Sequence, residues 1–407
     1  MEKAKNIRRI ETQEIQTAVD KKLVITVVFL LVIGFMSVFS ASLPMCMTNG
    51  MWPFYYVVQH LMCLAFGVWG LYGLSKLDYN RLKPYAIPFA IFVIFLLLLV
   101  QFSPLGVTLG GATRWLNLGF IKFQPSELTK ISIIMLMANV LSLNFSKSRR
   151  LYERTEISSY IYPLVYTGII LVMIFVALKQ PNLSMALILS GIALCMYICS
   201  GKTLKFVGIA FVIAILGIGL IKADVIDLTK VLEPHQIERI KNFLNGNTDV
   251  QGGGYQVFHS MIALASGGIV GQGYGASKEK LGWLPEAHTD FIFAVVGEET
   301  GFLGSLCIIA LYWMLFYRGM FIAFKSPNLY GRLMAFGITI SITMQAFFNI
   351  SVASSFLPAT GITLPFISYG GSSLMVSLCM IGILLNISKT QVKRIYQKNK
   401  VGNYAEN

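Results

Sequence analysis

"GWLPEAHTDFIFAVVGEE", residues 282–299, joins a polar stretch to an apolar run that opens on a carboxylate, Asp290. The apolar residues continue to about residue 316, and about 20 such residues cross a bilayer as a helix. A charge beside lipid is costly, so ionisable residues at such places are usually functional. The stretch therefore predicts a membrane helix with a candidate functional carboxylate, Asp290, at its mouth.

The whole chain has the composition of an integral membrane protein. Of its 407 residues, 55% are hydrophobic and 13% are charged, whereas a soluble domain contains roughly 25% charged residues. The net charge of +14 does not indicate a nucleic-acid partner, because most Lys and Arg residues stand in short segments between apolar runs, where they set membrane orientation. Residues 1–22 are polar and lack a small-residue cleavage site, so we expect an uncleaved tail.

The apolar runs predict ten transmembrane helices. They lie at residues 23–43, 55–75, 85–103, 126–144, 160–178, 183–200, 204–222, 290–316, 331–355 and 368–388. The positive-inside rule puts both termini in the cytoplasm. The expected fold is thus an all-α integral membrane protein of the cytoplasmic membrane. Its ten-span domain, 23–388, lies between the cytoplasmic tail 1–22 and the basic cytoplasmic tail 389–407, and one long structured extracellular loop, 223–289, follows span seven.

Two segments of that loop have recognisable patterns. Residues 255–268, "YQVFHSMIALASGG", have helical periodicity, with an apolar face formed by Val257, Phe258, Met261, Ile262 and Leu264. We expect a helix that lies in the outer interface. The glycines of "GGIVGQGYGAS" (267–277) are similar to a dinucleotide fingerprint, but no strand–helix–strand unit surrounds them. A tight turn with close backbone packing is expected instead.

A second outer cluster lies in "GGATRWLNLGFIKFQPSELTK", residues 110–130. Glu127 and Lys130 are three residues apart and share a helical face, so they can neutralise each other inside the bundle. This pair is either a structural ion pair or part of a site. Arg114 and Trp115 precede it, and a lone Trp115 would be an ordinary interfacial aromatic.

The tenth span begins at "LPFISYGGSSLM", residues 364–375, with small residues in its first turn. A helix N-terminus of this kind can cradle an anion, although small residues are also common in tight helix packing. The same outer level contains the basic residues Arg114, Lys122 and Arg239. Together these groups suit a substrate with a phosphate head, a lipid tail and a reacting hydroxyl.

Three segments carry a family resemblance: "RWLNLGFIKFQPSELTK", "LPEAHTDFIFAVVGEE" and "LPFISYGGSSL". They resemble the signature segments of the SEDS family, the FtsW/RodA/SpoVE proteins, in order from about residue 22 to 390, and "ITLPFISYGGSS" is closest to the FtsW/SpoVE branch. The resemblance implies a ten-span peptidoglycan glycosyltransferase. Such an enzyme polymerises lipid II, a disaccharide–pentapeptide on undecaprenyl pyrophosphate, at the outer leaflet during cell division or a related cell-wall process.

The resemblance also implies roles for individual residues. The essential acid of the family's "HTDF" segment falls on Asp290, which would act as general base on the attacking sugar hydroxyl. Arg114, Lys130 or the start of the tenth span would neutralise the leaving pyrophosphate, and a divalent cation, Mg²⁺ or Mn²⁺, can share that work. The residues expected to contact substrate are Arg114, Trp115, Lys122, Glu127, Lys130, Arg239, His288, Thr289, Ser368, Gly370, Gly371 and Ser372.

The sequence contains no dedicated metal cage. His259 and His288 are isolated and are expected to form hydrogen bonds, and the six cysteines lack a ligand spacing with His. The chain departs from the family's usual wording at Asn182, where Asp is common, and at Ser184, Met185 and Thr300. No role of an acid can be carried over to Asn182.

The resemblance implies partners besides lipid II: a class B penicillin-binding protein, which is a transpeptidase, and other divisome or elongasome membrane proteins. The basic residues 389–402 are expected to contact anionic membrane lipid, with a protein contact as the alternative. Two rival functions remain open. A lipid II flippase would also have interrupted spans and intramembrane charges, but its site would lie near the midplane. A non-catalytic scaffold would not need Asp290.

Overall fold

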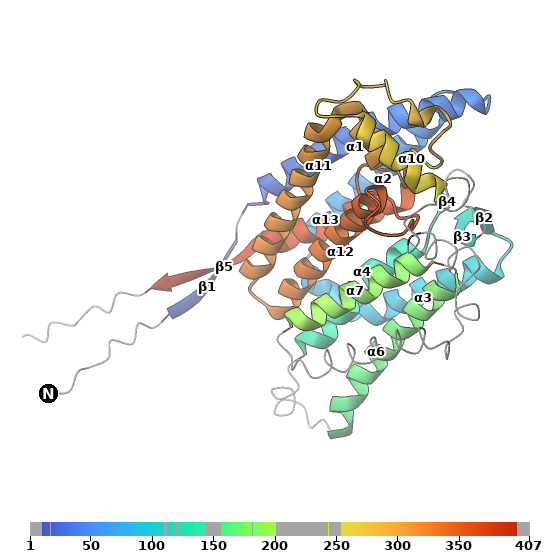
Figure 1. Cartoon of the computed structure of the whole chain (residues 1–407). Coiled ribbons are helices and arrows are strands. Elements are labelled where there is room, and N and C mark those ends of the chain that lie inside the picture. The colour runs from blue at the N-terminus through green and yellow to red at the C-terminus, as the bar shows by residue number, and fades with distance from the viewer. Residues whose placement is uncertain are drawn as a thin grey trace, which may run out of the picture.

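In the computed structural model the chain forms a bundle of long helices (Figure 1). The described residues are 10–16, 18–109, 112–117, 119, 122–143, 156–180, 182–200, 243 and 254–396. The helices of the bundle are α1 (Lys21–Thr48), α2 (Tyr55–Lys76), η1 (Tyr79–Tyr85), α3 (Ala86–Phe102), α4 (Ser126–Ser142), α6 (Glu156–Lys179), α7 (Leu183–Cys199), α11 (Ile292–Lys325), α12 (Leu329–Ala353) and α13 (Gly371–Ser388). Two short helices, α10 (Tyr255–Ser266) and η3 (Glu279–Leu281), lie in the segment before α11.

These helices confirm a multi-pass membrane protein. Within the described residues, 6 helices are long and apolar enough to cross a bilayer, namely α1, α2, the continuous η1–α3 segment, α11, α12 and α13. Helices α4, α6 and α7 fall on three further predicted spans. The predicted span 204–222 lies outside the described residues. Helix α11 continues to Lys325, past the predicted end at 316.

The centre of the bundle is formed by α4, α12 and α13, whose residues are mostly buried. Helices α2 and α13 pack so closely that a Cβ on Gly382 would lie 2.5 Å from the Leu71 carbonyl oxygen. A Cβ on Gly371 would lie 2.7 Å from Cys63 Sγ. Small residues allow this approach between membrane helices, where close packing supplies the attraction.

The two tails form a ribbon that the all-α prediction missed. Strands β1 (Ile10–Gln16) and β5 (Thr390–Tyr396) pair antiparallel, with Gln13 opposite Lys393, and extend from the bundle side by side (Figure 1). Asp20 caps α1 by accepting a hydrogen bond from the Leu23 amide at 3.0 Å. Its own amide donates to Ser388 Oγ at 3.3 Å, so the start of α1 meets the end of α13.

A second departure from the all-α prediction is a small sheet between α3 and α4. Strands β2 (Gly106–Leu109), β3 (Ala112–Asn117) and β4 (Lys122–Phe123) pair antiparallel in that order. Thr108 and Thr113 share a hydroxyl hydrogen bond of 2.8 Å across β2 and β3. The β-branched residues of this short segment favour strands. The prediction of ten spans treated the segment only as the connection between two of them.

The predicted helix at 255–268 is confirmed as α10, but its buried face differs. Val257, Ser260 and Ala263 are buried, whereas Met261 and Ile262 are exposed. The helix packs on α11, where Leu264 lies against Gly297, and Ser260 Oγ donates to the Ala353 carbonyl of α12 at 2.7 Å. The buried face is therefore the one that meets these two helices.

Helix α11 is broken at Gly301, where φ is 69° and ψ is −165°. Backbone amides of residues 272–273 donate to the carbonyls of 298–299 at 3.0 Å. Amides of 302–303 donate to the carbonyls of 268–269 at 2.9 and 3.2 Å. The glycine-rich turn therefore satisfies the backbone groups that the break exposes, as buried backbone requires. This is the close backbone packing expected from the sequence.

Candidate active site

Asp290 lies in a turn directly before α11. The turn is centred on Glu286, which has a positive φ of 55° and whose carbonyl accepts from the amides of Thr289 and Phe291 at 3.1 and 3.3 Å. The Asp290 carbonyl accepts a 2.7 Å hydrogen bond from Asn349 Nδ2 on α12. Asp290 is partly exposed, so its carboxylate is reachable while its backbone is held.

The loop between α12 and α13 faces Asp290 and forms the opposite wall of the candidate site. Gly361 has a φ of +68°, and a Cβ built on it would lie 3.4 Å from Asp290 Oδ2. Asn349 Nδ2 also donates to the Ile362 carbonyl at 2.6 Å. One turn earlier on α12, Gln345 Nε2 donates to the Thr363 carbonyl at 3.0 Å. Two carboxamides on one face of α12 thus hold two consecutive carbonyls of this loop.

The expected pair of Glu127 and Lys130 is confirmed as a buried ion pair. Lys130 Nζ lies 2.6 Å from Glu127 Oε2 and 2.5 Å from Gln345 Oε1. Gln345 Nε2 also donates to Ser373 Oγ at 3.1 Å. Both charges are buried, and a buried charge needs such partners. The pair braces α4 against α12 and α13, next to the amides that hold the Asp290 wall.

Arg114, on β3, reaches the start of α7. Its Nε donates to the Gln180 carbonyl at 3.1 Å, and Gln180 Nε2 donates to the Leu97 carbonyl at 2.9 Å. Asn182 caps α7 by accepting from the Met185 amide at 3.3 Å, which an uncharged amide can do as well as Asp. Trp115 follows on the same strand and is partly buried.

Ser184, one of the departures from the family wording, touches the loop that faces Asp290. Its Oγ donates to the Thr360 carbonyl at 2.8 Å. The hydroxyl thus ties α7 to the residue before Gly361. This contact gives the substituted position a structural role that its sequence context did not indicate.

At the start of α13, the small residues serve packing. Ser372 Oγ accepts from the Gln124 amide at 2.8 Å, and its hydroxyl also lies 3.4 Å from the Lys122 carbonyl. Gly370 is buried against Thr363. These contacts show the close packing expected of small residues, and the anion cradle stays a prediction. Lys122 itself lies on β4 with an exposed side chain.

Ser368 has a structural role in the turn before α13. Its Oγ accepts from the Leu364 amide at 2.7 Å, and its own amide donates back to the Leu364 carbonyl at 2.9 Å. The residue closes the turn that brings the loop facing Asp290 into α13.

His288 is buried against two tyrosine rings that also contact each other. Its ring centroid lies 4.9 Å from that of Tyr56 and 5.6 Å from that of Tyr369. The Tyr369 amide donates to the His288 carbonyl at 2.9 Å. Burial lowers the pKa of His288, and the nearby Glu286 carboxylate opposes that shift only in part, so the ring is neutral at pH 7. Thr289 Oγ1 donates to Glu286 Oε2 at 2.8 Å.

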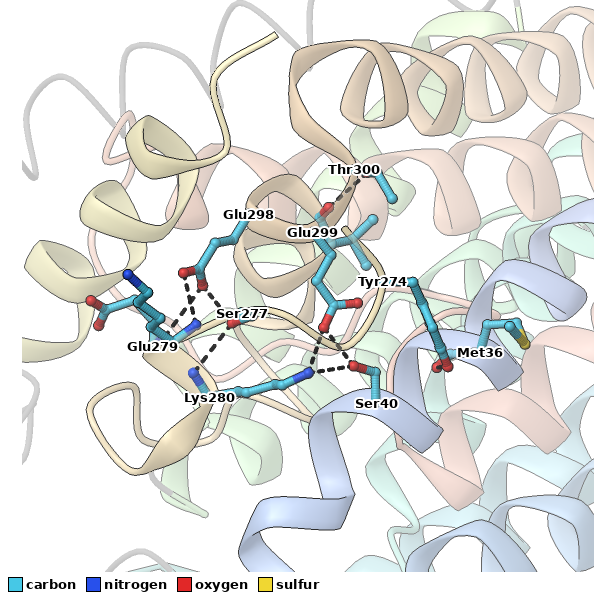
Figure 2. A network of polar contacts seen from close by, with 11 residues as sticks. Met36, Ser40, Tyr274, Ser277, Glu279, Lys280, Glu298, Glu299 and Thr300 are labelled. Carbon is cyan, nitrogen blue, oxygen red and sulfur yellow. Dashed lines mark hydrogen bonds and ion pairs between the residues drawn. The ribbon is translucent and has the colours of Figure 1, made fainter. Parts of the chain in front are cut away.

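The segment directly before Asp290 is anchored by two carboxylates inside α11 (Figure 2). Lys280 Nζ lies 2.7 Å from Glu299 Oε1 and 2.7 Å from Ser40 Oγ on α1. Glu298 accepts from the Ser277 hydroxyl and from the Lys278 amide, the latter at 2.9 Å. This network was not among the predictions from the sequence. Two adjacent glutamates inside an apolar run were the available signal.

Arg239 lies outside the described residues. Among the described residues no group of three His, Cys, Asp or Glu side chains could hold a metal ion. His259 forms the hydrogen bond expected of it, with Nδ1 2.7 Å from Glu279 Oε2. The six cysteines are free. The described part of the site thus contains the Asp290 carboxylate with its amide supports, the Glu286 carboxylate in the same turn, and basic groups.

The chain is similar to known proteins along nearly its whole length. The model of the "Cell cycle protein" family FtsW/RodA/SpoVE matches residues 21–393. A "Probable peptidoglycan glycosyltransferase FtsW" of Trichlorobacter lovleyi is 37% identical over 369 residues, which are 91% of this chain and 93% of that protein. "Stage V sporulation protein E" of Bacillus subtilis is 33% identical over 376 residues, 92% of this chain and 98% of that protein.

Solved structures have the same fold. One, from work titled "Structural coordination of polymerization and crosslinking by a peptidoglycan synthase complex", matches with a TM-score of 0.70 and 26% identity over 91% of this chain and 98% of that chain. The rod shape determining protein RodA of Thermus thermophilus matches with a TM-score of 0.63 and 25% identity over 91% and 97%. The chain therefore belongs to the FtsW/RodA/SpoVE family of membrane proteins.

Proposed function

We propose that this protein is a peptidoglycan glycosyltransferase that polymerises lipid II at the outer leaflet of the cytoplasmic membrane. The names of its relatives support this activity. The observation that carries the proposal is the setting of Asp290. Asp290 stands directly before α11, and its partly exposed carboxylate faces Gly361 in the loop between α12 and α13. Its backbone is tied to α12 through Asn349.

In this reaction Asp290 accepts the proton of the attacking sugar hydroxyl of one lipid II. That oxygen forms a bond to the anomeric carbon of another lipid II, while the bond to undecaprenyl pyrophosphate breaks. The leaving group takes the electron pair and needs positive charge nearby. Arg114 and Lys122 supply it on the sheet between α3 and α4. A divalent cation that shares this work remains a prediction.

Lys130 has a different place in the proposal. Its ammonium group is engaged by Glu127 and Gln345 inside the bundle. We therefore assign it to support of the outer loops rather than to the leaving group. This assignment adopts the structural ion pair, one of the two interpretations that the sequence left open.

We propose ten spans with both tails in the cytoplasm, with residues 204–222 as span seven and 223–289 outside. Arg318, near the far end of α11, pairs with Asp20 beside the tails. Asp290 stands at the other end of α11, so the tails and the carboxylate lie at opposite ends of the bundle. That arrangement supports an outward-facing site if the basic tails are cytoplasmic.

We further propose that a class B penicillin-binding protein, a transpeptidase, accompanies this chain together with other divisome or elongasome proteins. The similar structure described as part of a peptidoglycan synthase complex supports such a partner.

The test is lipid II polymerisation by the purified protein with its transpeptidase partner, comparing wild type with Asp290→Asn at equal folding and complex yield. Glycan strands from wild type alone are the expected result. Strands from both proteins would remove Asp290 from catalysis. Strands from neither, with lipid II translocation in vesicles, would favour the flippase. A mutant that polymerises nothing yet supports growth in cells would favour the scaffold.

A further inference from the structure

The backbone at Asp290 is held by a side chain of another helix. In the first turn of α11, the amides of Ala294 and Val295 donate to the Phe291 carbonyl. The Asp290 carbonyl lies one residue earlier and accepts from Asn349 Nδ2 of α12 at 2.7 Å. The α12 side chain of Asn349 therefore helps to fix the backbone of Asp290 at the point where α11 begins.

The same carboxamide holds the wall that faces the carboxylate. Asn349 Nδ2 donates to the Ile362 carbonyl at 2.6 Å, next to Gly361. Its partners are both carbonyl oxygens, which only accept, so the two N–H bonds of the amide must point at them. One NH₂ group thus fixes the backbone at Asp290 and the backbone beside Gly361, which faces it.

Asn349 is itself rigidly mounted. It is almost fully buried on α12, one turn from Gln345, whose amide is tied to Lys130, Thr363 and Ser373. We therefore expect the Asn349 amide to move little, and with it the Asp290 and Ile362 carbonyls that it binds. This is what a reacting group requires, because small misplacements cost large factors in rate.

Simple packing does not account for this residue. Asn349 Oδ1 is buried with no hydrogen-bond partner among the described residues, and such an oxygen costs free energy. An apolar side chain would avoid that cost in a helix of this bundle. The two N–H donors are therefore the feature that the position needs.

We propose that Asn349 is a positioning residue for the glycosyl transfer, acting through the backbone of Asp290 and Ile362. The inference rests on the proposed function of Asp290. Asn349 sets the distance between the carboxylate and the Gly361 wall, and hence the place of the attacking hydroxyl. Loss of its donors lowers turnover while substrate binding, which uses other groups, is retained.

The experiment measures kcat and KM for lipid II with the full chain and its transpeptidase partner. Asn349→Asp keeps the size of the side chain but replaces the NH₂ donor with a carboxylate oxygen. We expect kcat to fall at least about tenfold with KM within about twofold, since an interaction that acts only in the transition state lowers kcat and kcat/KM together.

Asn386→Asp is the matched control. Asn386 on α13 also bridges two segments, because it accepts from the Tyr79 amide and donates to the Ser75 carbonyl, both at 3.0 Å, but it lies at the opposite end of the bundle. We expect this variant to retain the wild-type kcat. An equal fall of kcat in both variants would overturn the proposal, because the effect would then be one of general stability.

Two further variants keep the outcomes separate. If Asn349→Asp does not fold, Asn349→Ser, which has one donor at a shorter reach, takes its place, and a wild-type kcat for it would overturn the inference. Asp290→Asn is measured in parallel. An active Asp290→Asn refutes the proposed function itself, whereas an inactive Asp290→Asn beside a fully active Asn349→Asp refutes only the role of Asn349.

Discussion

The bare Cα of Gly361 faces the carboxylate of Asp290: a Cβ placed on Gly361 would stand 3.4 Å from Asp290 Oδ2. Gly361→Ala would therefore add both backbone strain, at a φ of +68°, and a methyl group against the proposed base. We expect a stability loss of about 1–2 kcal/mol and a clear loss of lipid II polymerisation.

The control for Gly361→Ala is Gly50→Ala. Gly50 has a φ of +63° but nothing within 4 Å of its Cβ position. Thermal unfolding in detergent should show similar destabilisation of both variants, and polymerisation should fall in Gly361→Ala alone. Equal activities would mean that the gap beside Asp290 is not part of the site.

Breaking the buried ion pair of α4 should be costly. Lys130→Met leaves the Glu127 carboxylate buried without its cation, and we expect a loss of roughly 3–5 kcal/mol. Adding Glu127→Gln removes that unpaired charge and should restore most of the stability. Polymerisation should return with it, because the structure uses Lys130 as a brace. Restored stability without restored activity would instead place the pair in the chemistry.

Lys280 should control the order of the segment before Asp290. Lys280→Met removes the cation of Glu299 and a donor to Ser40, and we expect faster hydrogen exchange over residues 271–290. Lys278, whose side chain is exposed, gives the control Lys278→Met, for which exchange should match wild type. Unchanged exchange in Lys280→Met would show that backbone contacts alone hold the segment.

The buried His288 predicts a loss of stability in acid. Burial lowers the pKa of His288 in the folded state, so as the pH falls through about 6.5 the unfolded chain takes up a proton that the folded chain resists. Folding then loses free energy, and stability declines from pH 7 toward pH 5. His288→Gln should reduce this decline in thermal unfolding measured across that range. An identical pH dependence would assign the acid sensitivity elsewhere.

The pairing of the tails can be tested by cross-linking. Cysteines at Gln13 and Lys393, which lie opposite each other in the ribbon, should form a disulfide on oxidation in a background without the native cysteines. Gln13 with Tyr396 is the out-of-register control, since Tyr396 lies opposite Ile10. Efficient bonding of the control pair would contradict the register.

The positions of most helices followed from the sequence because a bilayer demands long apolar runs. The site was predictable in part: Asp290 and the Glu127–Lys130 pair stood out as charges in apolar surroundings. Asn349 and Gln345 did not, although two amides one turn apart in an apolar span were a usable signal. The contacts of Lys280 with Ser40 and of Ser184 with Thr360 join residues far apart in the chain. No local pattern encodes such pairings.

The break in α11 has a consequence for exchanging parts between relatives. Amides and carbonyls freed at Gly301 bond to the glycine-rich turn at 268–273, so the N-terminal part of α11 and the segment before it share one hydrogen-bond network. A chimaera that takes the loop from one protein and the span from another separates donors from their acceptors. Functional chimaeras should therefore have their junctions before α10 and after Leu303, so that the glycine-rich turn and the start of α11 are exchanged together.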